Sequence, residues 1–114
     1  MRSLRRLFTL LLFLAVTPAF AQAKKYEGQE AAALRCAHIV ALTAVALSDA
    51  GGIGEAEKEV MLGISFLILD GHVSGTWAQK KAALEIVRDR RNVTDTLEDF
   101  ERYAEQCLRD FPIN

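Results

Sequence analysis

The chain has 114 residues, of which 51% are hydrophobic and 25% charged, and its formal net charge is −1. This length allows one domain, close to the size at which a single hydrophobic core is only just sufficient. The mildly acidic balance argues against nucleic acid as a partner and against attraction to anionic membrane surfaces.

Residues 1–21 have the pattern of a cleaved secretory signal peptide. The basic start of this segment contains Arg2, Arg5 and Arg6. The apolar stretch 7–16 follows, and Ala19 and Ala21 supply the small residues that a signal peptidase requires. This stretch is shorter than the roughly 20 residues of a membrane-spanning helix. We therefore expect cleavage after Ala21, which leaves residues 22–114 as a single domain without a stable membrane anchor.

Such a signal predicts that the mature domain is periplasmic or secreted. The adjacent Arg5 and Arg6 leave the general secretory and the twin-arginine routes open, although Leu4 stands where the twin-arginine pattern has Ser or Thr. Because cleavage removes three arginines, the mature domain would carry a net charge of about −4.

The mature sequence predicts helices and no strand. We expect four helices, at about 28–48, 55–70, 76–91 and 94–110. Gly51 is suited to the left-handed conformation that closes the first helix, and Gly71 is expected to close the second. Thr76 and Gln79 have the spacing of a capping box at the start of the third. Pro112 follows the fourth. The expected fold is an all-α, up-down-up-down four-helix bundle.

The last of these helices has the clearest amphipathic pattern. Its buried stripe is expected to contain Leu97, Phe100, Ala104, Cys107, Leu108 and Phe111. On its outer side, Glu98 and Arg102 have the i,i+4 spacing of an ion pair. The preceding helix has a weaker apolar face, marked by Trp77, Leu84 and Val87.

The helices expected at 28–48 and 55–70 are apolar over most of their circumference. A helix of this kind must be buried on more than one side, and a small bundle has few such positions. We expect the surplus apolar surface to be covered by a second copy of the chain, by an unidentified protein partner or by an apolar ligand, with a homodimer favoured. The side chains expected at this interface are His38, Leu42, Val45, Ile64, Phe66 and Ile68.

Cys36 and His38 stand two positions apart in the segment LRCAHIVAL. On a helix they point about 200° apart, so they cannot form a nucleophile–base pair or share a metal ion. The mature chain has two cysteines, Cys36 and Cys107. An even number of cysteines in an exported chain favours a disulfide, and the ends of the first and last helices lie together in the expected bundle. We predict a Cys36–Cys107 disulfide, with two free thiols as the alternative.

The sequence gives no reason to expect a catalytic residue, a cofactor or a metal. Asp70 and His72 could supply two metal ligands, but a transition-metal site usually needs three or four. There is no Gly-rich phosphate loop, serine nucleophile motif or CxxCH haem-attachment motif. We therefore expect that the protein is not an enzyme.

These features predict an exported, non-catalytic helical protein that acts through protein–protein contacts. A periplasmic chaperone or carrier for apolar clients or ligands is the first alternative, and a thiol-dependent enzyme is the second. The layout resembles that of periplasmic acid-stress chaperones and periplasmic immunity proteins in architecture alone, which implies no particular function.

Overall fold

The structure, a computed structural model, describes residues 24–114. The predicted signal peptide and its cleavage site lie outside these residues. The described helices are α2 (Gly28–Asp49), α3 (Glu55–His72), α4 (Trp77–Arg90) and α5 (Val93–Asp110). The prediction of a small all-α four-helix bundle with one disulfide is confirmed.

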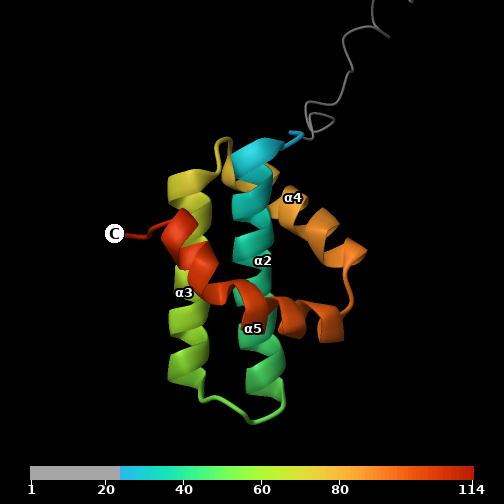
Figure 1. Cartoon of the computed structure of the whole chain (residues 1–114), viewed down its shortest axis with the longest axis vertical. Helices are drawn as coiled ribbons and strands as arrows, with labels where there is room; N and C mark the ends of the chain where they lie inside the picture. Colours follow the sequence, from blue (N-terminus) through green and yellow to red (C-terminus); the bar gives the residue numbers. More distant parts are fainter. Residues whose placement is uncertain (1–23) are drawn as a thin grey trace, which may run out of the picture.

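Helix α2 lies at the centre of the fold. It packs against α3, α5 and α4, whereas these three make few contacts with one another. In Figure 1, α3 returns alongside α2, and α5 crosses α2 obliquely. Helix α4 turns away from α3 by 117°. Close packing along one side of α2 depends on small side chains, because Ala33, Ala37 and Ala44, which share that side of the helix, are all fully buried.

This central position explains why α2 is apolar nearly all round. By length and composition alone, α2 could cross a membrane, and so could α3 and α4 taken together as one broken span. A core helix meets the same criteria, since it must be apolar toward every helix that surrounds it.

The disulfide joins the first and last described helices. Cys36 of α2 and Cys107 of α5 are bonded, their Cα atoms lie 5.6 Å apart, and both side chains are buried. Around them the core contains Leu34, Ile68, Leu69 and other side chains from all four helices. The bond therefore fixes the crossing of α5 over α2 from within the core.

Most of the predicted helix ends are correct. Gly51 has a φ of +75°, and the chain reverses there through hydrogen bonds from Gly52 N to Leu47 O and from Gly51 N to Ser48 O. These two bonds form a Schellman motif. The prediction for Gly71 is wrong, because this residue is helical and α3 continues to His72. The extended backbone of Val73 ends the helix instead.

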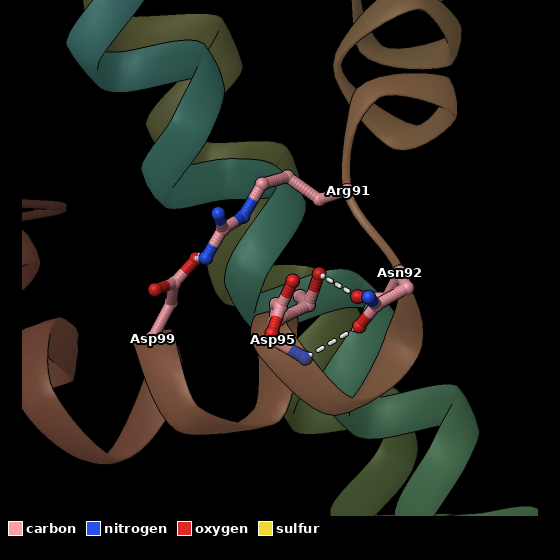
Figure 2. A network of polar contacts seen from close by, with 5 residues as sticks. Arg91, Asn92, Asp95 and Asp99 are labelled. Atoms are coloured by element: carbon pink, nitrogen blue, oxygen red, sulfur yellow. Dashed lines mark hydrogen bonds and ion pairs between the residues drawn. The ribbon is translucent and has the colours of Figure 1, made fainter.

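The corner between α4 and α5 is built from short polar contacts, shown in Figure 2. The Asn92 side chain accepts a 2.8 Å hydrogen bond from Asp95 N, while Thr96 Oγ1 donates to Asn92 O over 2.9 Å. Arg91 reaches across the corner, and its Nη2 lies 2.7 Å from Asp99 Oδ2. At the other end of α4, Thr76 and Gln79 form the predicted capping box. The sequence of α4 and α5 thus specifies where both helices begin.

Two predicted faces are less buried than expected. Leu108 on α5 is 42% exposed and Trp77 on α4 is 52% exposed. Leu108 lies about 100° around α5 from Cys107, whose side of the helix is the buried one, and Trp77 is the first residue of α4, at the edge of the core. The predicted Glu98–Arg102 ion pair does not form within 4.0 Å among the described residues.

Candidate functional site

The cysteines do not form a reactive site in this fold. Both sulfur atoms are in the disulfide, and the described residues contain no free cysteine. A thiolate is the species that attacks substrates or binds metals, so a thiol mechanism would first require reduction of a buried bond. The prediction of a disulfide in place of two free thiols is confirmed.

An apolar groove lies where α2, α3 and α4 meet. It has a volume of about 310 Å³. Its walls include His38, Leu42 and Val45 of α2, Leu62 of α3 and Leu84 of α4. The three α2 residues recur at i, i+4 and i+7, which places them on one side of the helix. His38, Leu42 and Val45, three of the predicted interface residues, therefore line one cavity.

The apolar surface continues from this groove along α3 to the start of α4. Phe66 follows Leu62 by one helical turn, and its ring packs against that of Trp77 at a centroid distance of 5.4 Å. Phe66 is 48% exposed, so this pair of rings, tilted by 54° to each other, still presents apolar surface to solvent. We use the term apolar groove for the cavity walls together with Phe66 and Trp77.

The other predicted interface residues of α3 have different positions. Ile68 is completely buried and belongs to the core, so its assignment to the interface is corrected. Ile64 is half-buried and packs against the core. Both face inward because the buried face of α3 centres on Ser65, which donates a 2.7 Å hydrogen bond to Ala37 O of α2.

His38 lines the groove but is itself only 6% exposed. Its Nε2 atom is buried and has no hydrogen-bond partner among the described residues. Burial lowers the pKa of His38 from its ordinary value, and Arg88 lowers it further, whereas Asp99 acts in the opposite direction. The imidazole is therefore held neutral at pH 7 and forms part of an uncharged wall.

Charged side chains of both signs border the groove. Lys81, Glu85 and Arg88 project from successive turns of α4 and line the same cavity. The border therefore carries both cations and an anion that can form ion pairs with a partner. The cavity interior, by contrast, is mainly aliphatic.

We compared the chain with known proteins. No protein family, curated protein or solved structure matches it. The chemistry of the groove must therefore be argued from its own residues. Within residues 24–114, no group of three or more potential metal-ligating side chains comes together.

Sequence reasoning missed Leu62, Leu84 and Trp77 as members of the groove. Leu62 was detectable, since it stands one turn before Phe66 on an otherwise apolar helix. Leu84 and Trp77 were not, because their amphipathic pattern predicts burial against the bundle. Their position depends on the oblique packing of α4, which no local pattern encodes.

Proposed function

We propose that this chain is an exported, non-catalytic helical protein that acts through protein contact at the apolar groove, and that the contact is formed by a second copy of the chain. The observation that carries this proposal is the continuous run of half-exposed large apolar side chains from Val45 through Leu62 and Phe66 to Trp77. Large exposed apolar patches on small soluble domains commonly mark interaction sites.

The mixed charges at the border of the groove favour a second copy of the chain as the partner. In a two-fold dimer the same patch meets itself, so each charged group on one side of the axis faces the equivalent patch of the other copy. Lys81 and Arg88 of one protomer can then pair with Glu85 of its partner. A groove bordered only by cations would instead repel its own copy.

The neutral state of His38 also supports self-association at the groove. A charged imidazole enclosed in the contact would have a considerable desolvation cost in each copy. An uncharged ring adds only apolar surface to the contact. The pKa shift of His38 thus keeps the groove compatible with self-association at neutral pH.

Analytical ultracentrifugation of the oxidised mature protein tests the proposal. We expect a dimer for the wild type and a monomer for Phe66→Glu, because the new carboxylate would be buried without a partner. Ile86→Glu is the matched control, since Ile86 is also 48% exposed but does not line the groove. A wild-type monomer at high concentration, or equal dissociation of both variants, would contradict the proposal.

The single tryptophan provides an independent readout. Trp77 is the only tryptophan of the chain and lies 52% exposed at the end of the groove. Dimerisation would shield it from water, so its emission should shift to longer wavelength on dilution. A monomeric wild type that binds a hydrophobic dye or unfolded clients at the groove would instead favour the chaperone or carrier alternative.

A further inference from the structure

A second hollow lies on the opposite side of α4 from the apolar groove. It has a volume of about 330 Å³ and is enclosed by the segment 24–26, by α2 and by α4. Its α4 lining residues are Ala83, Ile86, Val87 and Arg90. These lie about half a turn around α4 from the residues that line the groove, so the two depressions are separate.

The hollow combines an apolar floor with a ring of cations. The apolar part is formed by Ala31, Leu34, Ala83, Ile86 and Val87. The cations are Lys24, Lys25, Arg35, Arg90 and Arg91. No carboxylate is among the described residues that line it. This concentration of positive charge is unexpected in a mature domain whose acidic residues exceed its basic ones.

Several of these walls are held in place by hydrogen bonds. Tyr26, which also lines the hollow, donates a 2.7 Å hydrogen bond from its hydroxyl to Ser74 O. The Lys24 ammonium donates to Ser74 Oγ and lies 5.3 Å from the centroid of the Tyr26 ring. Arg91 is fixed by Asp99 on the far side of the α4–α5 corner (Figure 2). The segment that precedes α2 is therefore a built wall of the hollow.

Neighbouring carboxylates neutralise only part of this charge. Asp99 pairs with Arg91, Glu27 lies 4.0 Å from Lys25 in a solvent-exposed contact of little energy, and Glu30 accepts a hydrogen bond from Ser74 N. Arg35 and Arg90 have no ion-pair partner within 4.0 Å among the described residues. Two guanidinium groups from different helices are thus available to one anion, and guanidinium is well suited to phosphate and carboxylate.

We propose that this hollow binds a small amphipathic anion, with its hydrocarbon part against Ile86 and Val87 and its phosphate or carboxylate between Arg35 and Arg90. The half-exposed Ile86 supplies apolar surface that such a ligand would cover. The cationic ring selects an anionic head group, and the apolar floor selects against simple inorganic anions. The site is independent of the proposed dimer contact, because it occupies the other side of α4.

Calorimetric titration with hexyl phosphate tests the proposal, with inorganic phosphate and 1-hexanol as partial ligands. Hexyl phosphate should bind, and each partial ligand should bind at least about tenfold more weakly, since each retains only one of the two sets of contacts. Binding should weaken as salt is added. Equal affinity for inorganic phosphate and hexyl phosphate would overturn the proposal, as would no binding of hexyl phosphate.

Three variants locate the site. Arg90→Gln should weaken hexyl phosphate binding by about tenfold or more, because a charge-assisted hydrogen bond is lost. Ala31→Phe should block the hollow without altering its charge. Arg109→Gln removes an exposed arginine of α5 that does not line the hollow, so it should leave binding unchanged. Equal weakening by Arg90→Gln and Arg109→Gln would show a non-specific charge effect and would overturn the site.

Vesicles identify the source of the ligand. Binding to phosphatidylglycerol vesicles but not to phosphatidylcholine vesicles, abolished by Arg90→Gln, would indicate that the anion is a lipid head group. Binding of hexyl phosphate without binding to either kind of vesicle would indicate a free small molecule. Either result supports the proposed chemistry, whereas vesicle binding that persists in both Arg90→Gln and Ala31→Phe would contradict it.

Discussion

Lys80 donates a 3.0 Å hydrogen bond from its ammonium to the backbone carbonyl of Leu69, although the lysine is only 8% exposed. The bond links the first turn of α4 to the last turn of α3. Carbonyl groups in the last turn of a helix carry partial negative charge, so a cation is favourable there. Lys80 thereby holds the sharp turn between α3 and α4.

Replacement of this lysine should destabilise the fold. We expect Lys80→Met to lower the free energy of unfolding by about 1–2 kcal/mol, because the charge-assisted bond is lost while the apolar stem is kept. The lower part of the usual range applies, since Leu69 O also accepts a bond from Val73 N. Urea denaturation followed by circular dichroism measures the change. The exposed Arg109 of α5, which lines neither the groove nor the hollow, gives the control Arg109→Met, and an equal loss in both variants would count against this role.

Removal of the disulfide should have a larger effect. Cys36 and Cys107 are separated by 71 positions, and closing a loop of that length in the unfolded chain is worth about 4 kcal/mol in the chain-entropy model. We therefore expect the double variant Cys36→Ala/Cys107→Ala to lose a large share of the stability typical of a domain this size. Chemical denaturation of both forms gives the difference, with intact mass confirming the oxidation state. A loss below about 1 kcal/mol would disagree with the chain-entropy account.

Stability should also depend on pH through His38. Its pKa is lowered by burial and by Arg88, with partial opposition from Asp99. Lys81 and Glu85 are the other charged groups that line the same cavity. Below about pH 6.5 the unfolded chain binds a proton that the folded chain does not bind. The free energy of unfolding should therefore fall as the pH decreases through 6.5 and level off below the folded pKa.

The His38→Gln variant isolates this contribution, because glutamine does not titrate. Denaturation at about pH 7.5 and about pH 5 should show a larger loss of stability for the wild type than for His38→Gln. Carboxylates that titrate in this range affect both proteins alike and cancel in the comparison. Parallel pH dependence of the two proteins would refute the assignment to His38.

Much of the fold follows from local sequence signals. The Gly51 turn, the Thr76 capping box and the Asn92 cap of α5 set helix ends, and their chemistry is complete within a few residues. The cysteine pair was predictable because only one pairing exists. Gly71 was misleading, since glycine permits a helix end without requiring one.

The site was less predictable because it depends on how helices cross. The spacing of Leu42 and Val45 identified one wall of the groove, but Ile68 was wrongly placed there. On a helix that is apolar all round, periodicity does not distinguish the face against the core from the face toward solvent. The cationic hollow could not be predicted for a similar reason. Its arginines come from α2 and from the end of α4, and they converge only in the folded chain.

The central position of α2 has a consequence for how this sequence can diverge. A larger side chain at Ala33, Ala37 or Ala44 would push apart α2 and a neighbouring helix, and no other pair of helices could compensate. Outside the apolar groove and the cationic hollow, the outward faces of α3, α4 and α5 carry no such constraint. Distant relatives should therefore retain small residues at these three positions and the cysteine pair, while the outer surface away from the two proposed sites differs freely. Common ancestry could then be recognised from the spacing of alanines along α2 even where overall sequence identity is no longer detectable.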